Sequence, residues 1–91
     1  MEITGNAVAG TLESSDVFLE IRPNDKGIEI ELNSIVMNQY GDEIRDVIKD
    51  VLKEMRVENA HVRANDRGAL ECVIRARVQT AVLRAGKEAA Q

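Results

Sequence analysis

The segment AVAGTLESSD, residues 7–16, places two neighbouring serines in a turn between two strand-like runs. Alternating positions flank the turn: Val8, Gly10 and Leu12 before it, and Val17, Leu19 and Ile21 after it. Alternation of this kind is typical of strands, so the two sets are expected to form matching faces. The Ser and Asp side chains of residues 13–16 can hydrogen-bond nearby backbone and stabilise a chain reversal. The segment therefore predicts a β-hairpin with Ser14 at its tip.

A second turn and a third strand follow the hairpin. Residues 23–27, PNDKG, are all turn formers. Beyond them, apolar residues alternate with acidic ones: Ile28, Ile30 and Leu32 with Glu29 and Glu31. This pattern predicts a strand with one face in water. The first third of the chain is thus predicted to be an antiparallel meander of three strands.

A continuous apolar stripe at helical spacing comes next. It consists of Ile44, Val47, Ile48, Val51, Leu52 and Met55. The start of this helix has two alternatives. Asn33 or Ser34 could cap a longer helix that runs through residues 36–40, or the helix could begin at Gly41–Asp42. We favour the longer helix.

The last third of the chain predicts a strand, a turn and a second helix. Residues 60–64 alternate, with Ala60, Val62 and Ala64 on one face and His61 and Arg63 on the other. Residues 65–68, NDRG, predict a turn and a helix start. From Ala69 to a terminal cap at Gly86, apolar residues return to helical spacing: Leu70, Val73, Ile74, Val78, Ala81 and Val82. Their β-branched side chains make strand an alternative for residues 70–78, but spacing and length favour helix.

These elements predict an α+β fold in the order β-β-β-α-β-α, with a small mixed sheet and both helices on one of its faces. The third and fourth strands, joined by a helix, should be parallel neighbours. We expect one domain, residues 1–91, with residues 1–6 fraying or leading into the first strand and 87–91 forming a frayed tail. The only aromatic residues are Phe18 and Tyr40, so the core should be aliphatic.

Charge and composition exclude several classes of function. The net charge is −4, and acidic and basic residues are interspersed, which argues against nucleic-acid or anionic-membrane partners. No apolar run approaches the ~20 residues of a spanning helix, and the N-terminal residues show no basic-plus-apolar signal pattern, so a soluble, cytoplasmic protein is expected. The single cysteine, Cys72, cannot form an internal disulfide.

Few side chains suggest chemistry. His61 is interpreted as a solvated histidine and Cys72 as a small buried apolar residue. Asp42, Asp46 and Asp50 share a helix surface with Lys and Arg, which favours an ion-pair face over a metal site. No catalytic and no metal-binding residues are expected. Ser14 and Ser15 have no histidine placed to activate them, so neither is expected to be a nucleophile of its own. From the residues alone, an exposed hydroxyl at the hairpin tip is either an ordinary turn serine or a target for another enzyme.

Three stretches carry a resemblance to a known family: AGTLESSDV at residues 9–17, YGDEIR at 40–45 and DRGALECVIRAR at 66–77. Together they resemble the acyl carrier subunit, the γ subunit, of citrate lyase. The similarity runs from about Ala7 to Ala85, nearly the whole chain. Common acyl carrier proteins are four-helix bundles with a serine at a helix start, and this strand-rich sequence is not of that kind.

The resemblance implies that Ser14 is the attachment site of a covalent cofactor, 2'-(5''-phosphoribosyl)-3'-dephospho-CoA. A dedicated prosthetic-group transferase adds it through a phosphodiester. The arm carries acetyl and citryl thioesters between the α subunit, an acyl transferase, and the β subunit, a citryl lyase, while citrate is cleaved to acetate and oxaloacetate. Family members often have Gly where this chain has Ser15, which places a second hydroxyl beside the expected site.

Two alternatives remain open at this point. The carrier subunit of malonate decarboxylase uses a similar arm on a related small domain, and the acyl group on the arm would distinguish the two. The other alternative is an unmodified protein-interaction domain, in which Ser14 would have no essential role.

Overall fold

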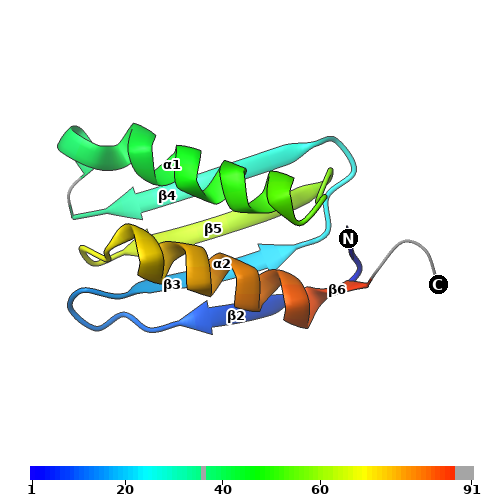
Figure 1. Cartoon of the computed structure of the whole chain (residues 1–91), viewed down its shortest axis with the longest axis horizontal. Helices are drawn as coiled ribbons and strands as arrows, with labels where there is room; N and C mark the ends of the chain where they lie inside the picture. The colour runs from blue at the N-terminus through cyan, green and yellow to red at the C-terminus, as the bar shows by residue number, and fades with distance from the viewer. Residues whose placement is uncertain (36, 88–91) are drawn as a thin grey trace.

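The computed structural model describes residues 1–35 and 37–87, and these form two helices and six strands (Figure 1). The elements in chain order are β1 (Glu2–Ile3), β2 (Ala7–Gly10), β3 (Val17–Arg22), β4 (Ile28–Ser34), α1 (Met37–Glu54), β5 (Ala60–Asp66), α2 (Glu71–Ala85) and β6 (Gly86–Lys87). The predicted α+β class is confirmed, and the fold is not a helical bundle.

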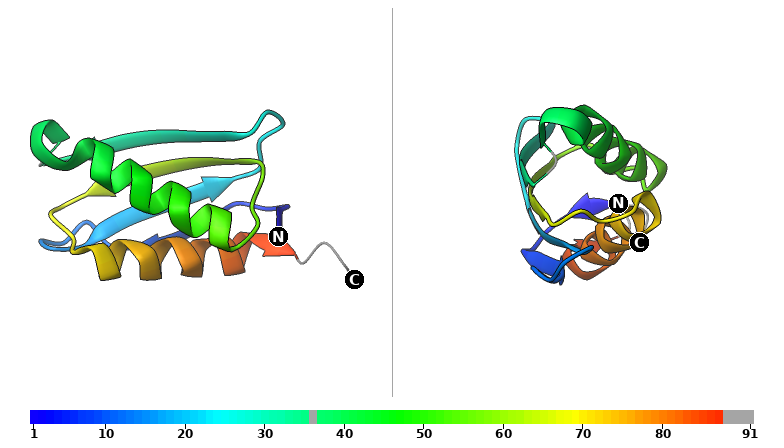
Figure 2. Two further views of the ribbon diagram at one scale, coloured as in Figure 1. Left: turned by 45° about the horizontal axis from the view of Figure 1, so that its top comes forward. Right: turned by 90° about the vertical axis from the view of Figure 1, so that its left-hand side faces the viewer.

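The main sheet has the strand order β2-β3-β5-β4. β2 pairs with β3 and β3 pairs with β5 in antiparallel fashion, whereas β4 and β5 are parallel. The expected hairpin and the expected parallel pair are therefore both present. Figure 2 shows α1 and α2 side by side on one face of this sheet, as predicted.

The predicted three-strand meander is wrong, because β5 lies between β3 and β4. Residues 23–27 pass around the start of β5, where the Ala60 amide donates to the Gly27 carbonyl (3.0 Å) and the Gly27 amide donates to Asn59 Oδ1 (2.8 Å). A loop of this length does not force the strands on either side of it to pair. The inward side chains of β5 are fully or nearly fully buried, whereas those of β4 are only half-buried, so β5 suits the central position.

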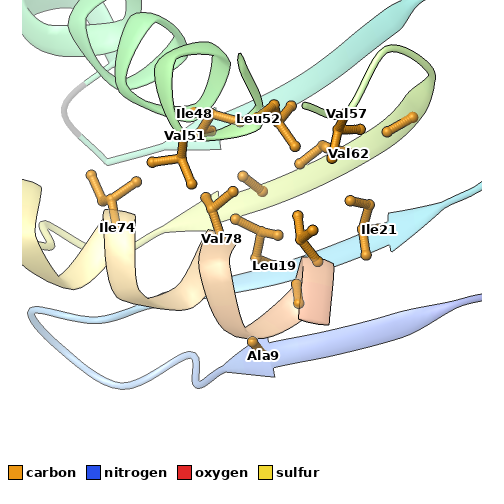
Figure 3. Packing of buried hydrophobic residues seen from close by; sticks show 14 of the residues in the cluster. Ala9, Leu19, Ile21, Ile48, Val51, Leu52, Val57, Val62, Ile74 and Val78 are labelled. Carbon is orange, nitrogen blue, oxygen red and sulfur yellow. The ribbon is translucent and has the colours of Figure 1, made fainter. Parts of the chain in front are cut away.

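An aliphatic core fills the space between the sheet and the helices (Figure 3). Leu19 and Ile21 of β3, Val62 of β5, and Ile48 and Leu52 of α1 all belong to this core, and all five are at most 1% exposed. From α2, the core receives Ile74, Val78, Ala81, Val82 and Ala85. Neither Phe18 nor Tyr40 belongs to this cluster, which confirms the expectation of an aliphatic core.

The prediction of which side chains of the first strand face the core is also wrong. Ala9 pairs with Leu19 and is 3% exposed, whereas Val8 is 44% and Leu12 is 53% exposed. The reason is that α2 packs directly over β2 and β3. Small alanine side chains fit beneath a helix this close, and Val8 points to the helix-free face.

The N-terminal residues are ordered, which corrects the expected fraying. Glu2–Ile3 pairs with Gly86–Lys87 in a second, two-stranded sheet, and Ile3 is buried. The terminal ammonium donates to the carbonyls of Met55 (3.0 Å) and Arg56 (2.9 Å). Lys87 likewise lies in a strand rather than a frayed tail, while residues 88–91 lie outside the described residues. Two-residue strands are too short to show a sequence pattern.

Both helix starts differ from the expected positions. Asn33 and Ser34 do not cap α1, because β4 continues to Ser34. The longer helix is still favoured over a start at Gly41, since Tyr40 and Gly41 both lie within α1; Val36 lies outside the described residues. α2 begins at Glu71 rather than Ala69, with Leu70 as its N-cap residue, and residues 71–78 are helix rather than strand.

Gly10 at the end of β2 is expected to be intolerant of substitution. Its φ is +90°, and a Cβ at this position would overlap the Val17 carbonyl oxygen. We predict that Gly10→Ala lowers the free energy of unfolding by about 2 kcal/mol, because backbone rather than a flexible side chain must move. Urea denaturation measures this change.

Gly5→Ala is the matched control, since nothing lies within 4 Å of a Cβ built there. Its expected effect is below ~0.5 kcal/mol. Equal effects of the two substitutions would contradict the close approach between β2 and β3.

Candidate functional site

Ser14 and Ser15 lie in the loop between β2 and β3, and both are exposed. This loop is at the same end of the molecule as the loops that follow β4 and β5, opposite the N-terminus and β6 (Figure 1). Residues 11–16 connect the strands, so Ser14 lies near the middle of the reversal. The structure therefore agrees with the expected presentation of the Ser14 hydroxyl at a turn.

The carboxylate of Asp16 holds the base of this loop. It accepts two hydrogen bonds from one guanidinium, from Arg77 Nε to Oδ1 (3.0 Å) and from Arg77 Nη2 to Oδ2 (2.9 Å). The Thr11 hydroxyl donates to Oδ2 (2.7 Å), and the Val17 amide donates to Oδ1 (2.7 Å). Bidentate pairs between arginine and a carboxylate are strong and directional. Asp16 thus ties both ends of the loop to helix α2.

These bonds lower the pKa of the Asp16 carboxyl well below its usual range. The hydrogen bond from Arg77 is the largest cause, and the hydrogen bond from Thr11 is the next. The Asp16 side chain is only 13% exposed. The ionised form is therefore the stable one in the folded protein.

Backbone hydrogen bonds attach the serine loop to the loop after β5. The Ser15 amide donates to the Arg67 carbonyl (2.8 Å), and the Arg67 amide donates to the Asp16 carbonyl (2.9 Å). Within the serine loop, the Asp16 amide donates to the Glu13 carbonyl (3.2 Å). Glu13 and Ser15, on either side of Ser14, are thereby held by backbone hydrogen bonds, while Ser14 itself is exposed.

Ser15 has a left-handed backbone conformation, with a φ of 65°. Glycine adopts this region without a steric penalty, whereas other residues do so at some cost. A glycine would therefore adopt the backbone conformation of position 15 more readily than the serine does. At position 15 it is therefore the backbone conformation of the turn, and not a need for a hydroxyl group, that favours one residue type over another.

A second carboxylate, Asp66, organises the neighbouring loop. It is 1% exposed, the one buried polar side chain in the part of the chain that the structure describes. It accepts hydrogen bonds from the Ser34 hydroxyl (2.8 Å), the Gly68 amide (3.2 Å) and the Ala69 amide (3.0 Å). Asp66 therefore fixes the loop against which the serine loop is bonded.

Sequence reasoning missed Arg77 and Asp66 as structural residues of this site. Arg77 is not part of the apolar pattern that predicted the second helix, and its partner Asp16 lies 61 residues away in the sequence. No local spacing identifies such a pair. The available signal was that Asp16 and Arg77 both fall within the stretches that carry the family resemblance.

The other sequence candidates have different surroundings from those expected. His61 is half-buried rather than solvated: Arg22 Nη2 lies 3.1 Å from its Nδ1, and Glu31 Oε1 lies 3.6 Å from its Nε2. Cys72 was expected to be buried and is exposed. It lies in the first turn of α2, and the buried stripe of that helix starts two residues later, at Ile74.

The expected ion-pair face of α1 differs from the prediction, because Asp50 pairs with an arginine of α2 rather than with a Lys or Arg of its own helix. Arg75 of α2 donates to Asp50 (2.8 Å) and also pairs with Glu54 (3.7 Å) and Glu71 (3.0 Å). In residues 1–35 and 37–87, no group of three or more His, Cys, Asp or Glu side chains is placed to hold a metal ion.

An open groove of about 550 Å³ lies on the helix-free face of the sheet, beside Leu12 and Phe18. Its charged side chains pair with one another, since Arg63 Nε lies 3.1 Å from Glu31 Oε2 and Arg63 Nη1 lies 4.0 Å from Glu20. As for the helices among the described residues, none is both long and apolar enough to cross a bilayer.

Removing the arginine partner of Asp16 should destabilise the protein more than removing the arginine that links the two helices. Arg77→Met leaves a largely buried carboxylate without its bidentate donor. Arg75→Met releases acidic side chains that are at least half exposed, and exposed ion pairs contribute little. Thermal unfolding at neutral pH measures both variants. The assignment of Asp16 as an anchor fails if Arg75→Met is the more harmful change.

The depressed pKa of Asp16 also predicts a pH dependence. A carboxyl whose pKa is lowered by folding stabilises the fold above its ordinary pKa of 3.8, and that stabilisation is lost as pH falls toward the lower, folded-state pKa. We predict that Asp16→Asn is less stable than the wild type at neutral pH. The difference in the free energy of unfolding between the two proteins should decrease progressively below about pH 4. Denaturant titrations at several pH values measure this difference. A difference that does not change with pH would contradict the ion pair between Asp16 and Arg77.

Comparison with known proteins identifies the family. Residues 4–85 match the family model described as malonate decarboxylase delta subunit (MdcD). The citrate lyase acyl carrier protein of Escherichia fergusonii is 54% identical over 89 residues, covering 97% of this chain and 92% of that protein. The protein of the same name from Halothermothrix orenii is 47% identical over 89 residues, covering 98% and 95% of the two chains.

A solved structure shares the fold. It is the crystal structure of a Pseudomonas malonate decarboxylase hetero-tetramer in complex with malonate. The matched chain has a TM-score of 0.79 and 20% identity, with coverage of 90% of this chain and 84% of that chain. This likeness establishes the fold, whereas identities of 47–54% over nearly the whole length establish the closer relationship. The chain belongs to the citrate lyase acyl carrier protein family.

Proposed function

We propose that this chain is the acyl carrier subunit of a citrate lyase and that Ser14 is its attachment site. The observation that carries the proposal is an exposed serine hydroxyl in a loop whose two ends are fixed by Asp16 and by the Arg67 backbone. A carrier must present its prosthetic group to other proteins from a defined position. Membership of this family implies that the carrier holds a covalently attached prosthetic group.

The finer proposal is that the group is 2'-(5''-phosphoribosyl)-3'-dephospho-CoA, joined to the Ser14 oxygen through a phosphodiester. The surroundings of Ser14 suit a large group, because residues 11–15 are exposed and none of them belongs to the hydrophobic core. When attached, the group supplies a terminal thiol that holds acyl groups as thioesters. The residues of this chain position the attachment point and keep the core undisturbed.

The proposed partners follow from the same role. They are the α subunit, an acyl transferase, the β subunit, a citryl lyase, and the transferase that loads the prosthetic group. Tethering raises the effective concentration of the acyl group at each partner's active site. We further propose that the whole chain acts as one carrier domain in the cytoplasm, with no nucleic-acid partner and no membrane partner.

A carrier subunit of malonate decarboxylase is the second candidate, because the matching family model and the matching solved structure both carry that name. The identities favour citrate lyase: 54% and 47% to its carriers against 20% to the malonate decarboxylase chain. The acyl group on the isolated carrier and the reaction it supports distinguish the two, since malonyl, or acetyl with malonate-dependent release of carbon dioxide, would indicate malonate decarboxylase.

Substitution of the two serines tests the attachment site. Ser14→Ala should fold and assemble but give no citrate cleavage when it is co-expressed with the α and β subunits and the transferase. Ser15→Gly should remain modified and active, and it should be at least as stable as the wild type because it removes a left-handed serine. Citrate turnover and the unfolding midpoint measure these outcomes. An active Ser14→Ala complex would instead support an unmodified interaction domain.

A further inference from the structure

Two arginines are bonded to the loop that holds Ser14, and they differ in whether the guanidinium is paired. Arg77 donates two side-chain hydrogen bonds to Asp16, at 3.0 and 2.9 Å. Arg67 meets the loop through its backbone: its carbonyl accepts from the Ser15 amide (2.8 Å), and its amide donates to the Asp16 carbonyl (2.9 Å). The Arg67 side chain is exposed, and it has no ion pair or hydrogen bond in the part of the chain that the structure describes.

The backbone hydrogen bonds place Arg67 close to Ser14. Chain segments joined in this way lie about 5 Å apart, and Ser14 directly precedes the bonded residue Ser15. An arginine side chain is longer than this separation, and that of Arg67 is not held elsewhere among the described residues. The guanidinium can therefore reach a group on the Ser14 oxygen while the Arg67 backbone stays in place.

The charges around Ser14 favour a cation beside any phosphate attached there. Glu13 directly precedes Ser14, is exposed, and has no ion-pair partner among the described residues. The charge of Asp16 is already compensated by Arg77. A phosphodiester on Ser14 adds a further negative charge to a chain whose net charge is −4. Of the two arginines bonded to the loop, Arg67 is the one whose charge is not compensated by a carboxylate.

The chemistry of the arginine side chain suits a phosphate ester. The planar guanidinium can donate two parallel, charge-assisted hydrogen bonds to phosphate oxygens. Exposed ion pairs are usually weak, because two flexible side chains must be brought together. Here the phosphate would be joined to the same loop that the Arg67 backbone holds, so the two groups start close to each other.

We propose that the Arg67 side chain is the phosphate-binding group of the attachment site and pairs with the phosphate ester on the Ser14 oxygen. The inference rests on the function proposed above, and it adds the residue that binds the first phosphate of the attached group. The ligand class is a phosphate ester of serine. A phosphate placed on Ser14 without the rest of the group presents the same kind of oxygens to Arg67.

The pKa of a phosphate on Ser14 tests this pairing. Phosphoserine is incorporated at position 14 during translation, and its second ionisation, near pH 6, is followed by phosphorus NMR. A paired guanidinium favours the dianion and lowers this pKa. Arg67→Gln should therefore raise the phosphate pKa by about 0.5 relative to the chain that keeps Arg67. Arg67→Lys keeps the positive charge and should raise it by less.

Arg56→Gln is the matched control, because it removes the same charge from the other end of the molecule. Arg56 is exposed and has no ion pair among the described residues, and its carbonyl accepts from the terminal ammonium (Figure 1). Its substitution should leave the phosphate pKa unchanged. Equal increases for Arg56→Gln and Arg67→Gln would overturn the proposal, as would an unchanged phosphate pKa in a correctly folded Arg67→Gln chain.

A second measurement needs no substitution at Arg67, so it does not depend on how a variant folds. The guanidinium proton resonances of Arg67 should move downfield when Ser14 carries the phosphate, because these protons then enter charge-assisted hydrogen bonds. The resonances of Arg56 should stay where they are. Arg67 resonances that do not respond to the phosphate would overturn the pairing.

The two proposals fail separately. Suppose that the pKa of a phosphate on Ser14 depends on Arg67, but the chain isolated from an active complex carries no group at Ser14. That result refutes only the proposed function. A chain that is modified at Ser14 in the active complex, but whose Ser14 phosphate is insensitive to Arg67→Gln, refutes only the phosphate-binding role of Arg67.

Discussion

The bidentate contact between Arg77 and Asp16 is the interaction on which the presentation of Ser14 depends. It joins a loop between two strands to a helix that begins more than fifty residues later. The same helix buries its other face against β2 and β3, so the loop, the sheet and the helix form one rigid unit. A small domain with an aliphatic core has little room for an enclosed active site. It can, however, hold one exposed hydroxyl in a defined place.

The periodicity of the sequence was sufficient to predict most of the elements. Alternation at Val17, Leu19 and Ile21 and at Ala60, Val62 and Ala64 identified strands whose inward residues are buried, and the Ile44–Met55 stripe identified α1. The order of the strands was not predictable in the same way. Periodicity tells which face of a strand is buried, but the insertion of β5 beside β3 depends on how the crossover returns and on the length of residues 23–27.

The candidate site, like the fold, could be predicted from the sequence only in part. The proposal of Ser14 as the attachment site came from the family resemblance, whereas its exposure was predicted from the turn chemistry around it and is confirmed. The residues that fix it, Arg77 and Asp66, make contacts across the tertiary structure that no local pattern contains. The prediction for Cys72 failed because it relied on a general tendency of the residue type. A residue with a strong general tendency to be buried is exposed here, because the register of α2 is set by Ile74 and Val78.

In the proposed function, the fold of this chain positions the attachment point. The covalent group provides the reactive thiol, and the partner subunits provide the active sites. The central claim is that Ser14 carries the group. The most direct measurement is the intact mass of this chain isolated from its native complex, followed by fragmentation to locate any added mass. The account predicts an increase equal to one phosphoribosyl dephospho-CoA group on Ser14. An unmodified chain from a catalytically active complex, or the added mass on Ser15, would contradict it.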